Sequence, residues 1–311
     1  MRRAAARATL LAVALSYGSQ DVALRLVLTM AAAPPPPAVA LVKALIQAAA
    51  FAPPYFLSRR DGNAPPWSVS LGLAASLVAA NEFLLAGLKR TSAAKAAFLL
   101  QLSVVFTPVL EYVVLRRRQS LRVWLGALLA CVGCAFLTGG SDASFAIVEQ
   151  RTGDLLVVAA ATAWAAYIVL TAAIPPDAGA LEVQARKNVC AAGFYGTCWA
   201  SAAAVEPSSG AWTPLALGLI AYCALVPGAV ADVLQQHAQS AIHAAEAAVI
   251  LASEPIWAAL FAAPALGEEL TRRVAGGGAI IFVGAALAVS GSEDEGVVGE
   301  GAALRGVDLG V

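Results

Sequence analysis

Polar side chains occur in the middle of several long apolar segments of this sequence. Gln20 and Asp21 lie well inside the first apolar run, Gln101 lies near the centre of another, and Glu254 directly precedes Pro255 in a third. In an apolar medium an ionised side chain costs several kcal/mol unless it is solvated or paired. These residues are therefore the first candidates for binding a polar ligand or for carrying a proton.

Other motifs that would carry chemistry are missing from the sequence. It contains neither a Gly-x-x-x-x-Gly-Lys-Ser/Thr loop for nucleotide hydrolysis nor a Gly-x-Ser-x-Gly nucleophile elbow. His237 and His243 have no cysteine nearby, which argues against a closed zinc site. Cys131 and Cys134 have the spacing of a redox or metal pair, but we interpret them as small packing residues of an apolar helix. The sequence thus predicts no enzyme, no cofactor and no metal site.

Composition places the chain in a lipid bilayer. Hydrophobic residues make up 60% and charged residues 13% of the 311 residues, and the mean hydropathy is +0.76. A soluble domain carries about 25% charged residues. The length accommodates ten helices of about 20 residues each, with little left for a soluble domain. The 20 basic and 20 acidic residues cancel, so no nucleic-acid partner is implied.

We expect ten spans separated by short turns. The first eight are residues 8–30, 39–57, 67–88, 93–115, 121–138, 153–173, 188–205 and 213–234. The last two lie within residues 244–291, on either side of the turn Gly267-Glu268-Glu269. The first run also has features of a signal peptide, but its polar residues favour a span. Pro227-Gly228 predicts a kink in the eighth span.

The last two spans repeat an earlier part of the chain. Gly126 and Gly277 are 151 positions apart, and the same shift relates Gly133 to Gly284 and Arg122-Val123 to Arg273-Val274. We interpret residues 8–138 and 153–291 as two five-helix repeats, residues 139–152 as a linker, and residues 292–311 as a disordered acidic tail. Because each repeat has an odd number of spans, the second is inverted relative to the first, and such duplication is typical of transporters.

Basic residues near the span ends give an orientation. Placing both termini in the cytoplasm puts about twice as many basic residues inside as outside, with Lys187 assigned to the inner end of the seventh span. The turn Arg116-Arg117-Arg118 is then internal, and its equivalent, Gly267-Glu268-Glu269, is external. We expect a multi-pass protein of the plasma membrane or an internal membrane.

Within these spans, mid-membrane polar and aromatic side chains define a candidate substrate path. Its members are Gln20, Asp21, Asn81, Glu82, Gln101, Trp164, Tyr167, Glu254 and Trp257. Structural alternatives stay open. Asp21 also suits an ion pair with Arg25, Glu82 also suits the outer interface beside Lys89 and Arg90, and the aromatic residues also suit simple packing. We interpret the fifth and tenth spans as scaffold, because Gly126, Gly133, Gly277 and Gly284 allow close helix approach; a homodimer contact is compatible with that face.

Four stretches carry a resemblance to a known family. Leu266-Gly267-Glu268, the preceding Glu254–Leu260, Ser92–Leu99 with Phe106-Thr107-Pro108, and Tyr17-Gly18-Ser19 resemble motifs of the EamA-type branch of the drug/metabolite transporter superfamily. The first repeat departs from the pattern at Leu115-Arg116-Arg117, where Gly-Glu is lost. The resemblance implies ten helices, two inverted EamA-like repeats and a central cavity.

The resemblance also implies a transmembrane transporter that exports or exchanges a small organic metabolite by alternating access. Its partners would be the lipid bilayer and the solute, and Asp21 or Glu254 would couple protons if protons drive transport. An organelle antiporter for phosphorylated sugars or nucleotide sugars ranks lower, because the candidate cations Arg25, Lys43 and Lys95 lie near span ends. A non-transporting scaffold would confine its polar residues to span ends, and an intramembrane enzyme lacks a nucleophile and base.

Overall fold

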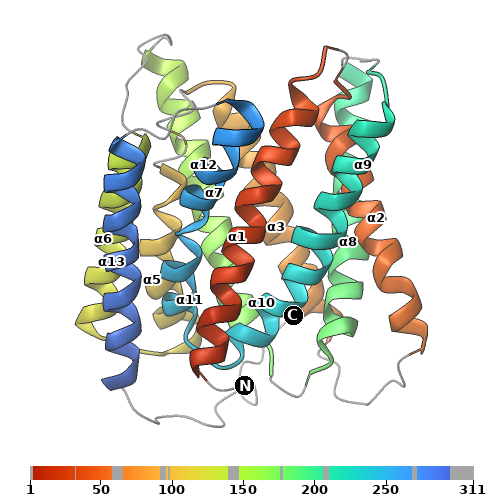
Figure 1. Ribbon diagram of the computed structural model, residues 1–311. Helices are drawn as coiled ribbons and strands as arrows, with labels where there is room; N and C mark the ends of the chain where they lie inside the picture. The colour runs from red at the N-terminus through yellow and green to blue at the C-terminus, as the bar shows by residue number, and fades with distance from the viewer. Residues whose placement is uncertain are drawn as a thin grey trace.

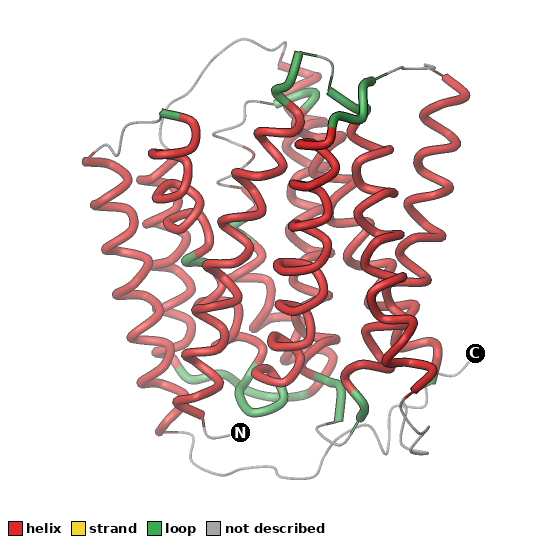
Figure 2. The backbone as a smooth tube through the Cα atoms, turned by 45° about the vertical axis from the view of Figure 1, so that its right-hand side comes forward, coloured by secondary structure: helices red, strands yellow, loops and turns green. Residues whose placement is uncertain are grey.

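The computed structural model describes residues 3–31, 33–57, 66–91, 96, 99–138, 147–175, 178–205, 210–267 and 272–294. In this part of the chain every regular element is a helix, and the helices run roughly side by side between two ends that carry the loops (Figure 2). Helical spans satisfy every backbone hydrogen bond within the segment, as the interior of a bilayer requires.

The first repeat contains α1 to α6, and the second contains α7 to α13 (Figure 1). The helices of the first are α1 (Arg3–Leu28), α2 (Pro36–Leu57), α3 (Trp67–Leu88), α5 (Ser103–Leu115) and α6 (Leu121–Thr138). Those of the second are α7 (Ile147–Ala172), α8 (Ala180–Val205), α9 (Pro214–Cys223), η1 (Ala224–Val230), α10 (Ala231–Gln239), α11 (Ala244–Leu251), α12 (Glu254–Leu266) and α13 (Arg272–Asp294). The segments α9, η1 and α10 follow one another without a gap and form one long helix.

The closing helices of the two repeats, α6 and α13, stand together at one edge of the bundle (Figure 1). A Cβ atom on Gly126 would lie 2.5 Å from the carbonyl oxygen of Gly284, and one on Gly133 would lie 2.7 Å from that of Gly277. Since the earlier glycine of α6 meets the later glycine of α13, the two helices are antiparallel. Equivalent helices that run in opposite directions make the repeats inverted, so the predicted all-α fold of ten helices is confirmed.

The two repeats also break and end their fourth helix at equivalent positions. Turns at 101–102 precede α5, and turns at 252–253 precede α12, again 151 positions apart. Each following helix ends in a left-handed residue, Arg116 with φ 56° and Gly267 with φ 70°. Glycine adopts this conformation without a free-energy penalty, whereas arginine adopts it only at a cost. The first repeat therefore keeps the backbone of the turn although it has lost the glycine.

Several boundaries differ from those expected from hydropathy. Helix α7 begins at Ile147, inside the segment assigned to the linker, and α13 continues to Asp294, into the segment assigned to the tail. Residues 139–146 and 295–311 lie outside the described residues. Helix α8 begins at Ala180 rather than at 188, because amphipathic residues extend it beyond the apolar run. The expected kink at Pro227-Gly228 is a π-helical segment, η1.

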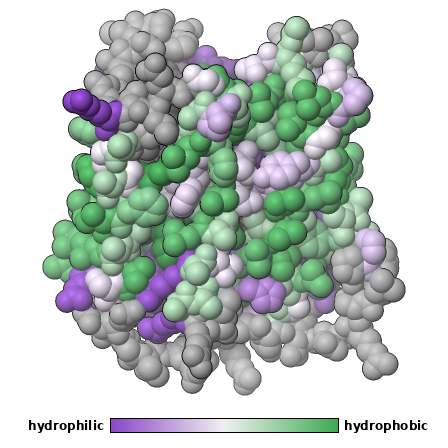
Figure 3. Space-filling model, in the orientation of Figure 1, coloured by the Kyte–Doolittle hydropathy of each residue, from purple (hydrophilic) through white to green (hydrophobic). Residues whose placement is uncertain are grey.

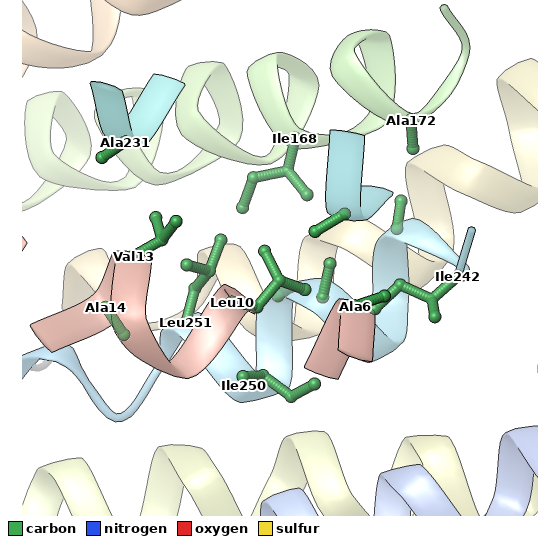
Figure 4. Close-up of a cluster of buried hydrophobic side chains, with 14 of the residues drawn as sticks. Ala6, Leu10, Val13, Ala14, Ile168, Ala172, Ala231, Ile242, Ile250 and Leu251 are labelled. Carbon is green, nitrogen blue, oxygen red and sulfur yellow. The ribbon is translucent and has the colours of Figure 1, made fainter. Parts of the chain in front are cut away.

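Apolar side chains face both the interior and the outer surface of the bundle. Figure 4 shows α1 residues such as Leu10 and Val13 packed among Ile168 of α7 and Leu251 of α11, all of them buried. On the outside, Leu121 is 73% and Leu155 is 71% exposed, and green apolar residues dominate the middle of the face in Figure 3. Six described helices are long and apolar enough to cross a membrane, and three shorter ones are apolar as well.

Candidate functional site

Two carboxyl groups from different repeats meet inside the bundle. The side chains of Asp21 on α1 and Glu254 on α12 are hydrogen bonded to each other. By accessible surface Asp21 is exposed and Glu254 half-buried, so other side chains do not fully enclose the pair. A hydrogen bond between two carboxyl groups requires that one of them carries a proton. The pair is thus a group that can gain and lose protons in the middle of the bundle.

Close approach of α1 to α12 brings this pair together. A Cβ atom on Gly18 would lie 2.6 Å from the backbone nitrogen of Ala258 and 2.9 Å from the carbonyl oxygen of Glu254. No real Cβ atom fits at such distances, so only glycine allows α1 to lie this close to the start of α12. Asp21 follows Gly18 by one turn, and it therefore projects beside Glu254.

The helix break at Ser253 positions Glu254. Pro255 has no backbone N–H for the carbonyl of Leu251, and α11 ends at Leu251. Glu254 is then the first residue of α12, where the partial positive charge of a helix N-terminus favours a carboxylate. The break thus places an acid at a helix start within the membrane, an arrangement that transporters use for ion and substrate sites.

A second charged pair lies deeper in the second repeat. Lys187 Nζ of α8 lies 2.5 Å from Asp232 Oδ2 of α10, and the Lys187 side chain is fully buried. The hydroxyl group of Tyr167 lies 3.5 Å from Nζ. The hydroxyl group of Tyr17 lies 3.1 Å from Asp232 Oδ1 and 2.6 Å from Gln235 Oε1. Tyr17 belongs to the first repeat, so this cluster also joins the two halves.

A second lysine lies near the acid pair. Lys43 Nζ of α2 donates to Gln20 Oε1 of α1 at 2.5 Å. Lys43 and Gln20 are both half-buried rather than closed off. Electrostatic interaction links Lys43 to Asp21, Asp232 and Lys187, so the polar groups form one connected region.

The aromatic candidates divide between this region and its support. The Trp164 and Tyr167 rings stack with their centroids 5.6 Å apart, beside the Lys187–Asp232 pair. Trp257 donates from Nε1 to Ser253 Oγ at 3.3 Å and meets Phe282 edge-on at 6.2 Å. Trp257 therefore braces the helix break next to Glu254.

Three other candidates lie apart from the acid pair in the contacts that the described residues make. Asn81 Nδ2 donates to Tyr195 OH of α8 and to Leu77 O, both at 2.9 Å, so it joins α3 to α8. Glu82 interacts electrostatically with Lys89, as the alternative of an interfacial position expects. Gln101 lies in the turn before α5, and its backbone oxygen accepts from Cys131 Sγ at 3.3 Å.

Both repeats are similar to one known protein family. The model of the EamA-like transporter family matches residues 6–139 and again residues 151–290. This chain belongs to the EamA-like transporter family. It is therefore an integral, multi-pass membrane protein of a transporter family, with a lipid bilayer and a solute as its partners.

Two individual similarities accompany the family match. An "Uncharacterized transporter" of Methanothermobacter thermautotrophicus is 34% identical over 97 residues, which cover 31% of this chain and only 28% of that protein. A solved crystal structure superposes with a TM-score of 0.78 at 18% identity and covers 96% of this chain and 100% of that one. At this identity the superposition shows the common fold alone.

In this EamA-like chain the two lysines occupy equivalent places. Lys43 is the eighth residue of α2, which begins at Pro36, and Lys187 is the eighth residue of α8, which begins at Ala180. Each lies roughly 10 Å along its helix from the start. Both are therefore well inside the bundle, which corrects the assignment of Lys43 and Lys187 to span ends. The error arose because the apolar run of α8 begins several residues after the helix does.

Four members of the polar region were not among the residues predicted for the substrate path: Tyr17, Lys43, Lys187 and Asp232. A shift of 144 positions between the second helices of the EamA-like repeats aligns the two lysines and was the available signal. No comparable signal marked Asp232, because its partner is 45 positions away on another helix. None of these four residues lines the hollow of about 340 Å³ between the start of α2 and the last part of α8, whose wall includes Trp199 and Trp212.

Proposed function

We propose that this protein is a secondary transporter that exports or exchanges a small organic solute by alternating access. The observation that carries the proposal is the hydrogen-bonded pair Asp21–Glu254, which bridges the inverted repeats at an accessible place inside the bundle. In transporters built from inverted repeats, solute and coupling ions bind at the repeat interface near discontinuous helices.

Contacts across the repeats support two alternating states. At the face where α1 begins, Arg7 Nε of α1 lies 2.6 Å from Glu246 Oε1 of α11. Glu111 of α5 accepts from the backbone N–H groups of Ala244 at 3.2 Å and Ala245 at 2.9 Å. Both contacts join one repeat to the other, so opening this face requires that they break. Asp21, by contrast, is already exposed. These contacts make the face around α11 the closed side in this conformation.

Protons are the coupling ion in this proposal. The shared proton of Asp21 and Glu254 gives the pair one negative charge, and a second proton removes it. Gaining or losing a proton changes the free energy of the Asp21–Glu254 pair inside the membrane, and the equilibrium between two conformations shifts with it. A transmembrane pH difference can therefore drive solute movement.

The orientation of the chain is part of the proposal. Arg7 Nη2 donates to the carbonyl oxygen of Val289 at 3.2 Å, so α1 begins and α13 ends at the same face. The basic turn after α5, with Arg116, Arg117 and Arg118, lies at that face too. Arg117 pairs with Glu111, and Glu111 binds the start of α11 close to the Arg7–Glu246 pair. Basic loops favour the cytoplasm. We assign both ends of the chain to the cytoplasmic side of a plasma or internal membrane.

Phosphorylated sugars and nucleotide sugars fit the region less well than singly charged solutes. A phosphate dianion carries two negative charges, and positively charged side chains make the strongest hydrogen bonds to it. Lys187 is fully buried and its charge is neutralised by Asp232. This leaves Lys43 as the accessible lysine of the polar region that the structure describes.

Reconstitution into liposomes tests the proposal. We expect flux of at least one labelled metabolite from a broad panel, and dependence of that flux on an imposed pH difference. Glu254→Gln and Asp21→Asn should each remove the pH dependence, whereas the control Glu82→Gln should keep it. Flux at the level of protein-free liposomes for the whole panel would contradict transport, and unchanged pH dependence in both variants would contradict proton coupling.

A further inference from the structure

Lys43 stands out among the charged groups of the bundle because an amide, not a carboxylate, is in contact with it. Among the described residues its Nζ atom has one hydrogen-bond partner, Gln20 Oε1 at 2.5 Å. Its repeat equivalent, Lys187, has Asp232 at 2.5 Å. The repeats thus hold two lysines at equivalent positions of their second helices, and only the second has an acid as its immediate partner.

The ionisable groups that interact with Lys43 come from four elements. Asp21 of α1 and Asp232 of α10 contribute negative charge, Lys187 of α8 contributes positive charge, and Cys223 of α9 is the nearby thiol. Asp232 already neutralises Lys187, and Asp21 is hydrogen bonded to Glu254 of α12. A negatively charged group that arrives beside Lys43 therefore does not have to displace an ion pair; it replaces the amide oxygen of Gln20.

A bound anion changes the net charge of the polar region. With one proton on the acid pair, Asp21 and Glu254 carry one negative charge together, which balances Lys43, while Asp232 balances Lys187. A bound monoanion adds one negative charge inside the membrane, where net charge is costly. A second proton on the acid pair restores neutrality.

We infer that Lys43 and Gln20 bind the carboxylate of an organic monoanion, and that the Asp21–Glu254 pair takes up one proton as it binds. This inference rests on the proposed transport function and names its substrate class. The Lys43 ammonium donates to one carboxylate oxygen, and the NH2 group of Gln20 is available for the other. Solute and proton then move together without net charge.

Accessibility supports the choice of Lys43 over Lys187. Lys43, Gln20 and Glu254 are partly exposed and Asp21 is exposed, whereas Lys187 is fully buried. Asp21 interacts with α12 through Glu254 and with α2 through Lys43, so its carboxyl group faces neighbouring helices rather than lipid. An arriving carboxylate consequently meets Lys43 and the acid pair together.

The test measures binding and proton uptake on the purified full-length protein in detergent. The probes are benzoate and benzamide, which have similar shapes but differ in charge, and the zwitterion phenylalanine. Calorimetric titration in buffers of different ionisation enthalpy gives the number of protons taken up per bound ligand. We expect benzoate to bind at least tenfold more tightly than benzamide, with about one proton taken up.

Variants separate the roles of the residues. Lys43→Gln should weaken benzoate binding at least tenfold, Lys43→Arg should retain most of it, and the control Lys89→Gln, an exposed lysine beyond α3, should bind like the natural protein. The double variant Asp21→Asn/Glu254→Gln should take up no proton. Thermal unfolding of each variant confirms that it is folded.

Each possible result of these measurements either supports or overturns the inference. Equal binding of benzoate and benzamide, or unchanged benzoate binding in folded Lys43→Gln, overturns the inference. Tight binding of phenylalanine with proton release, in place of benzoate binding with proton uptake, overturns the monoanion as the substrate class, because the ammonium group of the zwitterion would then replace the shared proton. If no carboxylate binds but neutral solutes cross the liposome membrane, this inference alone is overturned. If no solute crosses at all, the proposed function is overturned, and the binding result at Lys43 stands.

Discussion

Lys187 and Asp232 form an ion pair of 2.5 Å between α8 and α10, in a place where the lysine side chain has no exposed surface. Two tyrosines complete the surroundings, Tyr167 next to the ammonium and Tyr17 next to the carboxylate. Removing one member of a buried pair leaves the other charge uncompensated. The pair therefore ties the second helix of the second repeat to its third, and through Tyr17 to the first repeat.

Asp232→Ala is expected to destabilise the protein by about 3–5 kcal/mol, because a buried lysine would lose its counter-charge. The double variant Lys187→Met/Asp232→Leu should recover most of that loss. Glu182→Ala, which breaks the partly exposed pair Glu182–Arg186 within α8, should cost only about 0.5 kcal/mol. Unfolding midpoints in detergent measure all three; equal losses in the single and double variants would contradict the expectation.

Gly18→Ala should weaken the contact between α1 and α12. The new Cβ atom would lie 2.6 Å from the backbone nitrogen of Ala258, and backbone cannot move aside as a flexible side chain can. We expect a loss of about 1–3 kcal/mol. Gly193→Ala in α8 is the matched control, since nothing lies within 4 Å of its added Cβ and alanine favours a helix. A stable Gly18→Ala together with a destabilised Gly193→Ala would refute the assigned packing.

Arg116→Gly should stabilise the protein. Arg116 has φ 56°, a conformation that costs a non-glycine residue about 1–2 kcal/mol, and its equivalent in the other repeat is already glycine. The reciprocal change, Gly267→Ala, should destabilise by about 1 kcal/mol. Arg118→Gly, in the same loop with ordinary backbone, removes the same charge and should give no gain. Thermal midpoints of opposite sign for the two equivalent positions are the expected result.

Labelling from each side of the membrane tests the orientation. Single cysteines at Arg118 and Lys89, in a chain whose five natural cysteines are replaced, mark the two faces. We expect Arg118→Cys to react with an impermeant reagent from the cytoplasmic side and Lys89→Cys from the opposite side. Labelling of both from one compartment would contradict a membrane span between residues 89 and 118, and reversed sides would contradict the orientation alone.

Much of the architecture could be predicted from local properties of the sequence. Apolar run length gave the number of spans, and the 151-position shift of Gly126 to Gly277 gave the repeat. Helix ends were less predictable. Polar residues such as Glu182 and Gln184 begin α8 before its apolar run, so hydropathy placed Lys187 outside a helix that in fact contains it.

The polar region was only partly foreseen for a related reason. Asp21 and Glu254 were identified because a charge amid apolar residues is conspicuous in any single segment. Their mutual hydrogen bond joins residues at opposite ends of the chain, and its formation depends on the close approach that Gly18 permits. Lys43 appeared peripheral because the expected span began at residue 39, whereas the helix already begins at Pro36, inside the proline run.

The sequence by itself determined that this chain crosses a bilayer as two inverted halves, because bilayer thickness and backbone hydrogen bonding act on each segment separately. Only the tertiary structure decided which polar groups meet. Their pairing depends on the depth and rotation of packed helices, and these are set by close contacts such as that of Gly18 with Ala258, far away in the chain.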